Sequence, residues 1–261
     1  MNLTAVRDDT LSYFSEWRSC EDQEMHAAEQ CGTAHRPEQT SEIWAAASFR
    51  IVRQLFAPRI IQRIAEAAVK EKDSFKTDAD TIDGQKTYDL YIVKRGGVQH
   101  RRLHELTRSV VDMLIPLVQR AMRCPRCDLC DVFIRRYSPT ERRGVRQHYD
   151  SRAYATAIVT LNANAFRGGY FVVGRDGSRD AAAAPMHLLC DGGDVVVHGF
   201  NLLHGVHVTG GERFSLIAWF KREPGLRFSD GRPWIVELAQ QGDAVARTVL
   251  RQDTSGWLQG V

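Results

Sequence analysis

The pattern of apolar residues changes character about halfway along the chain. In the first half, apolar residues recur at helical spacing and predict an amphipathic helix over residues 58–71, which Pro58 is well suited to begin. A longer helix is predicted over residues 103–122, where one face carries Leu106, Val110, Met113, Leu114, Leu117 and Val118. Pro116 lies inside this second helix, so we expect it to kink the helix or to end its first half.

From Asp131 onward the pattern becomes that of short strands separated by Gly, Pro, Asn and Asp. Eight strands are predicted, over residues 131–137, 145–150, 154–161, 169–174, 186–189, 194–198, 204–208 and 213–220. Eight short strands with turns between them favour a sandwich or jelly roll, closed enough to hold a ligand.

Three regions follow from this pattern. Residues 1–41 form a polar N-terminal extension, residues 42–224 form the main domain with its core at 130–221, and residues 225–261 form a C-terminal helical extension. The last region is too short to bury its own apolar face, so we expect it to pack on the core.

Composition narrows the classes of protein that fit. Hydrophobic residues make up 43% of the 261 residues, which is ample for a buried core. The net charge of +3 argues against nucleic-acid binding by the whole chain. No apolar stretch is long enough to span a bilayer, and the N-terminus has no apolar signal-peptide core, so we expect a cytoplasmic protein. The six cysteines are then expected to be reduced thiols.

Candidate metal ligands lie in the strand-rich half. His148 and Asp150 are two positions apart, so on one strand both side chains leave the same face. A distal histidine completes two imidazoles and one carboxylate, the facial set of non-haem Fe(II) oxygenases. The candidates for it are His187, His198, His204 and His207, of which His204 and His207 are three positions apart and so point to opposite faces of one strand.

Arg213 begins the apolar strand RFSLIAWF, where a buried guanidinium needs an anionic partner. A dicarboxylate can supply that partner through two parallel hydrogen bonds, and Ser215 on the same face can donate another.

At this point the chain resembles the 2-oxoglutarate- and Fe(II)-dependent dioxygenases, nearest to their prolyl and lysyl hydroxylase branch. The matching segments are DVFIRRYSP, HYD, ATAIVTLNANAFRGGYFVV and GDVVVHGFNLLHGVHVTGGERFSLIAWF. The resemblance is close over residues 130–221 and only in outline over residues 45–129. It implies an α+β fold with a mainly β core, a double-stranded β-helix (jelly roll) supported by N-terminal helices.

The resemblance also assigns roles. In that family the HxD…H set binds iron, and a basic residue about nine positions after the distal histidine binds the far carboxylate of 2-oxoglutarate. Arg213 stands nine positions after His204, which selects His204 over His198 as the ligand. Tyr137 resembles the family's hydrogen-bond donor to the co-substrate. Thr156 and Thr160 fall on the strand that lines the co-substrate pocket.

The activity implied is hydroxylation of an aliphatic C–H of a peptidyl or free amino acid, with release of succinate and CO2. The cofactors implied are Fe(II), 2-oxoglutarate and O2, with ascorbate as a candidate reductant. Asp150 favours hydroxylation over halogenation, and Trp219 replaces a second arginine typical of nucleic-acid demethylases. Two alternatives are a non-catalytic jelly-roll binding module and a metal cupin that uses no 2-oxoglutarate. The complete ligand set opposes the first, and the pair Arg213 and Ser215 opposes the second.

Three further features carry weaker expectations. Cys124, Cys127 and Cys130 form CxxCxxC, but no neighbouring Cys or His completes a four-ligand zinc site. A basic cluster either solvates the rim of the site or steers an acidic substrate; it consists of Arg135, Arg136, Arg142, Arg143 and Arg146. The charged segment 71–87 is either a lid that orders over the iron or a plain surface loop.

Overall fold

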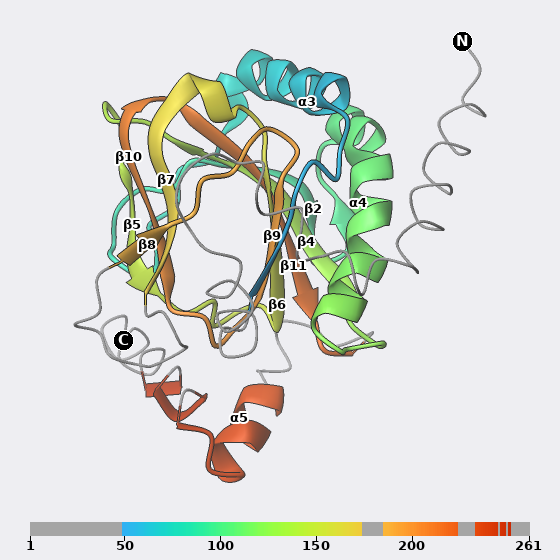
Figure 1. The fold of residues 1–261 in the computed structure, drawn as a ribbon, viewed down its shortest axis with the longest axis vertical. Helices are drawn as coiled ribbons and strands as arrows, with labels where there is room; N and C mark the ends of the chain where they lie inside the picture. The colour runs from blue at the N-terminus through green and yellow to red at the C-terminus, as the bar shows by residue number, and fades with distance from the viewer. Residues whose placement is uncertain (1–48, 174–184, 224–232, 245, 249, 252–261) are drawn as a thin grey trace. The chain divides into compact units, whose positions relative to one another are not determined.

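Two antiparallel β-sheets face each other in the computed structural model, which describes residues 49–173, 185–223 and 233–251 except positions 245 and 249. The predicted extension 1–41 lies outside these residues, as does the end of the C-terminal extension. All described residues belong to one structural unit, Ala47–Val261. The two sheets form the walls of a jelly roll (Figure 1).

The larger sheet has seven strands in the order β1-β9-β6-β11-β4-β2-β3. Their bounds are β1 Phe49–Val52, β9 Val195–Gly199, β6 Ala155–Thr160, β11 Arg213–Lys221, β4 Asp128–Tyr137, β2 Asp89–Lys94 and β3 Gly97–Val98. The smaller sheet has the order β5-β10-β7-β8. Its strands are β5 Gly144–His148, β10 His204–Gly211, β7 Phe166–Val173 and β8 Pro185–His187.

The helices α3 (Pro58–Lys70) and α4 (Arg101–Ala121) support the larger sheet, and Figure 1 shows α4 on the side away from the smaller sheet. Two 3-10 turns, η3 (Lys72–Ser74) and η4 (Ala163–Ala165), and the C-terminal helix α5 (Pro233–Gln240) complete the described elements. All eight predicted strands are present with ends displaced by three residues at most, and the predicted jelly roll is confirmed.

Strand β11 shows how the fold builds a polar cavity inside an apolar sandwich. Eight consecutive positions from Arg213 are buried or nearly so, so both faces of the strand are covered. Because side chains alternate along a strand, Phe214, Leu216 and the other even positions fill the core on one side. The odd positions, beginning with Arg213 and Ser215, face the smaller sheet. One apolar run therefore supplies both core packing and cavity lining.

Two expectations about α4 need correction. The helix runs without interruption from Arg101 to Ala121, so Pro116 does not end it. Leu114 and Leu117 on either side of Pro116 are buried, and this packing holds the helix together past the missing N–H. The buried face also includes Leu103 and Thr107, whereas the predicted Leu106 and Met113 are only partly buried.

The expectation of reduced cysteines is wrong for one pair. Cys124 and Cys127 form a disulfide, because the turn after α4 brings their Cα atoms to 5.3 Å, within the range that a disulfide bridges. Cys130 is a free, buried thiol on β4. Two of the three sulfurs are thus bonded to each other, and no zinc trio exists in CxxCxxC.

The segment 71–87 is held by polar anchors. The guanidinium of Arg142, 3% exposed, donates to Asp80 (2.8 Å) and Asp83 (3.1 Å) and to the carbonyl of Lys86 (3.2 Å). Arg146 donates to the carbonyl of Ile82. These contacts join the segment to the β4–β5 connection, and whether it also acts as a lid stays a prediction.

The basic cluster does not form a free positive surface. Arg136 pairs with Glu141 (2.7 Å), Arg142 with Asp80 and Asp83, and Arg135 with Asp89 on the neighbouring strand. These carboxylates neutralise most of the positive charge of the cluster.

Candidate metal centre and anion pocket

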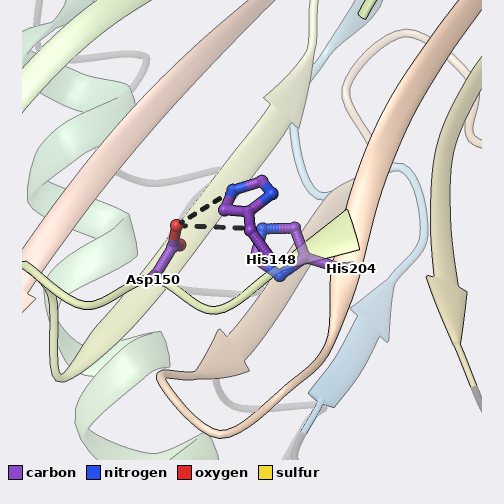
Figure 2. A group of neighbouring side chains, drawn as sticks. All are labelled: His148, Asp150 and His204. Carbon is purple, nitrogen blue, oxygen red and sulfur yellow. Dashed lines mark ion pairs between the residues drawn. The ribbon is translucent and has the colours of Figure 1, made fainter. Parts of the chain in front are cut away.

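The predicted ligands His148, Asp150 and His204 lie together between the two sheets (Figure 2). Each offers one ligand atom, and these atoms lie within 4.8 Å of one another. The Nε2 atoms of His148 and His204 are 3.7 and 3.8 Å from Oδ1 of Asp150. Two imidazoles and a carboxylate facing one point fit a divalent transition metal such as Fe(II).

The register of the smaller sheet brings the two histidines together. His148 ends β5 and His204 begins β10, and the two residues are direct partners across the antiparallel pair. Gly144 at the start of β5 makes this approach possible: a Cβ there would lie 1.9 Å from the carbonyl oxygen of Val206. A side chain at this position would push β5 away from β10 and separate the imidazoles.

Asp150 reaches the site by a different route from the predicted one. Strand β5 ends at His148, so Asp150 lies in the turn that follows, where the Ala153 N–H donates to its carbonyl at 3.4 Å. The hydroxyl of Thr156 donates to its Oδ2 at 2.5 Å. The turn and this hydrogen bond, not strand alternation, direct the carboxylate. Thr156 therefore contacts a ligand side chain, and it also lines the cavity as predicted.

Tyr149, between the two ligands, is buried in a cluster with the C-terminal extension. It packs with Phe200, Ile235 and Ala246, and the last two are fully buried. The described part of the C-terminal extension thus packs on the core, against the turn that carries Asp150.

Backbone contacts and burial set the protonation of the ligands. Nδ1 of His148 lies 2.8 Å from the carbonyl of Arg146, and Nδ1 of His204 lies 3.0 Å from that of Leu202. A carbonyl can only accept, so each Nδ1 carries a hydrogen, and in the neutral imidazole Nε2 is then the atom that presents a lone pair. Burial lowers the pKa of His204 well below 6.5. Burial opposes the charge of Asp150, but the facing imidazoles outweigh it and hold the pKa of this carboxyl well below its usual range. Neutral imidazole and ionised carboxylate are the forms that bind metal.

His198, the rival distal ligand, lies next to this group but outside it. It is fully buried, and its Nε2 lies 3.6 Å from Oδ2 of Asp150 and has no hydrogen-bond partner among the described residues. Its Nδ1 lies 2.9 Å from the carbonyl of Gly199.

Arg213 lies in the same cavity as the three ligands and is 3% exposed. Within the described ranges it makes no hydrogen bond or ion pair with a side chain, and its closest ring contact is with Phe166 at 5.7 Å. The hydroxyls of Ser215 and Tyr170 are also buried and have no hydrogen-bond partner in the described part of the chain. Burial lowers the pKa of Arg213 and raises that of Tyr170 well above 10, so the phenol remains a hydrogen-bond donor. The result is a buried cation with two free hydroxyls around it.

The two remaining predicted site residues, Tyr137 and Thr160, differ in whether they line the cavity. Tyr137 is buried, lines the cavity and is the direct cross-strand partner of Arg213. Thr160 is buried opposite Ser215 but is not among the residues that line the cavity.

Among the lining residues without a predicted role inside the cavity are Tyr170, Trp219 and Arg135, the last of which was expected only at the rim of the site. Strand parity could have identified two of them, since Arg135 is two positions from Tyr137 and Trp219 is six from Arg213. Tyr170 stacks on His204, with ring centroids 5.2 Å apart, and its place depends on the pairing of β7 with β10.

None of the helices in the described ranges is long and apolar enough to cross a membrane. No protein-family model matches the chain, and no curated protein matches it in sequence.

Solved structures with the same fold do match. One is a prolyl-4-hydroxylase from Pseudomonas putida, with 17% identity, TM-score 0.51, and 71% of this chain and 99% of that chain covered. HygX from Streptomyces hygroscopicus, solved with nickel and 2-oxoglutarate bound, shows 12% identity and TM-score 0.52, covering 74% and 89%. The epimerase SnoN, in complex with Fe3+, alpha ketoglutarate and nogalamycin RO, shows 11% identity and TM-score 0.53, covering 70% and 83%. At these identities the similarity establishes the double-stranded β-helix fold of this chain.

Proposed function

We propose that this protein is an Fe(II)- and 2-oxoglutarate-dependent dioxygenase that hydroxylates an aliphatic C–H of a peptidyl or free amino acid. His148, Asp150 and His204 would hold the iron, and Arg213 would bind the far carboxylate of 2-oxoglutarate. The reaction consumes O2 and 2-oxoglutarate and yields the alcohol, succinate and CO2.

The observation that carries this proposal is the buried Arg213, which has no anionic partner among the described residues and lies in one cavity with the three ligands. A buried, unpaired guanidinium costs several kcal/mol unless something neutralises it, and a bound carboxylate would do so. A metal cupin that uses no 2-oxoglutarate has no need of this arrangement.

Each side chain then has a defined task. Bound iron supplies the activation of O2 that no side chain here can provide. His148, His204 and Asp150 present lone pairs toward one point, and the Thr156 hydroxyl fixes the second carboxylate oxygen. Arg213, with Ser215 and Tyr170 as further donors, would orient the dicarboxylate. The apolar side chains of Val206 and Ile217, which line the same cavity, exclude water from it.

The fold neighbours support the same choice of cofactors. HygX was solved with nickel and 2-oxoglutarate, and SnoN with Fe3+ and alpha ketoglutarate. The matching structures include a prolyl-4-hydroxylase and the epimerase SnoN from nogalamycin biosynthesis, so the fold alone does not select the substrate.

The direct test measures succinate released from 2-oxoglutarate and O2 by the Fe(II)-loaded protein, against a panel of peptides and metabolites. Metal binding is measured separately by titration with Co(II). We expect His204→Ala to abolish both tight metal binding and succinate release. His207→Ala is the matched control, because His207 lies on the same strand but is exposed.

His198→Ala separates the two candidate distal ligands. We expect it to retain Co(II) binding, since His198 lies outside the ligand group. Full metal binding by His204→Ala together with loss in His198→Ala would reassign the ligand. An intact metal site without 2-oxoglutarate binding would instead favour the cupin alternative.

A further inference from the structure

A second arginine, Arg135, lines the cavity that holds the candidate metal ligands. It lies on β4 two positions before Tyr137, so the two side chains share the inner face of the larger sheet. Its side chain is 15% exposed. The two carboxylates of 2-oxoglutarate are already accounted for by the metal and Arg213, so Arg135 is not needed for the co-substrate.

Asp89 on β2 holds this guanidinium in a fixed orientation. Asp89 and Arg135 are direct cross-strand partners, and Nε and Nη2 donate to the two carboxylate oxygens at 2.6 and 2.7 Å. This side-on pair uses two of the five N–H groups of the guanidinium. In the part of the chain that the structure describes, Nη1 has no hydrogen-bond acceptor. The pair therefore fixes the group but leaves donors available to a ligand.

A row of packed aromatic rings lies on the same inner face. Trp219, half-buried, lines the cavity, and Phe133 packs against it edge-on with ring centroids 4.9 Å apart. Tyr91 packs on the other side of Phe133 at 5.2 Å. This row fixes the indole of Trp219, which gives an aliphatic chain an apolar surface to lie on.

We propose that Arg135 determines substrate specificity by binding a carboxylate of the substrate, whose aliphatic part lies against Trp219. The substrate would then be a small carboxylic acid, of the free amino acid class, and not an internal prolyl or lysyl residue of a peptide, which carries no carboxylate. This inference rests on the proposed function and selects among the substrates that it leaves open. A guanidinium held in place loses little conformational entropy on binding, so it suits a carboxylate well.

The alternative is a purely structural pair that joins β2 to β4. Removing Arg135 alone would leave Asp89 buried and unpaired, and the variant could fail to fold. The double variant Asp89→Asn/Arg135→Gln avoids this, because two neutral amides can keep a hydrogen bond between the strands. Arg126→Gln/Glu223→Gln is the matched control, since that ion pair is exposed and neither residue lines the cavity.

The test uses the full-length, Fe(II)-loaded protein and pairs of free L-amino acids with their carboxamides. The readouts are substrate-stimulated succinate release and binding of each acid to the Co(II)- and 2-oxoglutarate-loaded protein. We expect at least one acid to stimulate succinate release about tenfold more than its amide. In the double variant this acid-to-amide ratio should fall to about one, while 2-oxoglutarate affinity changes less than threefold. The control variant should keep the ratio.

A ratio near one in the unaltered protein, or an unchanged ratio in the double variant, would overturn the assignment. So would stimulation by peptides with an internal target residue only, or by no acid at all while 2-oxoglutarate still binds. Absence of any 2-oxoglutarate binding would instead contradict the proposed function, which keeps the two failures distinguishable.

Discussion

Two arginines in this protein are equally buried and have opposite surroundings. Arg142, between the β4–β5 connection and the segment 71–87, is 3% exposed and donates to two carboxylates and to backbone carbonyls. Arg213, at the head of β11, is also 3% exposed, and in the described ranges no carboxylate meets it. Burial alone therefore does not distinguish a structural arginine from a ligand-binding one.

The difference lies in whether the protein itself satisfies the charge. Arg142 replaces its water with Asp80, Asp83 and carbonyl oxygens, so its desolvation is compensated when the chain folds. Among the described residues, Arg213 loses its water without compensation from side chains, and the hydroxyls of Tyr170 and Ser215 also lack partners. Arg213 and Tyr170 line the same cavity, and uncompensated polar groups of this kind are best explained by a ligand that supplies the missing hydrogen bonds.

The largest expected effect is on stability, from Arg142→Met. The change leaves Asp80 and Asp83 close together without their cation, and we expect a loss of about 3 to 5 kcal/mol in the free energy of unfolding. Urea denaturation measures it. Arg126→Met, whose ion pair is exposed, should cost less than about 1 kcal/mol. Equal losses in the two variants would mean that the contacts of Arg142 are not structural.

Arg213→Met should show the reverse pattern. Because it removes an uncompensated buried charge, we expect unchanged or higher stability, by about 1 kcal/mol or more. The dissociation constant for 2-oxoglutarate, measured by calorimetric titration of the Co(II)-loaded protein, should rise about 100-fold, corresponding to about 3 kcal/mol. Arg213→Lys should recover part of this affinity, since it keeps the charge without the planar fork. A large loss of stability with unchanged affinity would place Arg213 in the same class as Arg142.

Ser215→Ala is the smallest and most specific test. Its hydroxyl has no partner within the described part of the chain, so its removal should not lower the free energy of unfolding. Loss of one hydrogen bond to the co-substrate should weaken 2-oxoglutarate binding about fivefold, equivalent to about 1 kcal/mol. If the free energy of unfolding falls and the affinity for 2-oxoglutarate does not, the hydroxyl stabilises the fold. Ser215 would then resemble Arg142 and not Arg213.

Much of the candidate site could be predicted from the sequence because strand alternation is local. The parity of Arg213 and Ser215 put both side chains on one face, and the opposite directions of His204 and His207 followed from an odd spacing. The eight strands themselves followed from short apolar runs with turn residues between them, and all eight are present. What these inferences have in common is that each depends only on neighbours in the chain.

The tertiary structure decided everything that depends on partners distant in the sequence. Asp150 lies beyond its strand, and Thr156 and the following turn direct it. The pairing of Arg142 with Asp80 and Asp83 spans about sixty residues of the sequence. The sequence pattern therefore gave no sign that most of the positive charge of the basic cluster is neutralised. The sequence by itself determined which side chains could share a face. Only folding determined which charges found a partner and which, like Arg213 among the described residues, remained buried without one. The reason is that compensation of a buried charge depends on three-dimensional neighbours that no local pattern specifies.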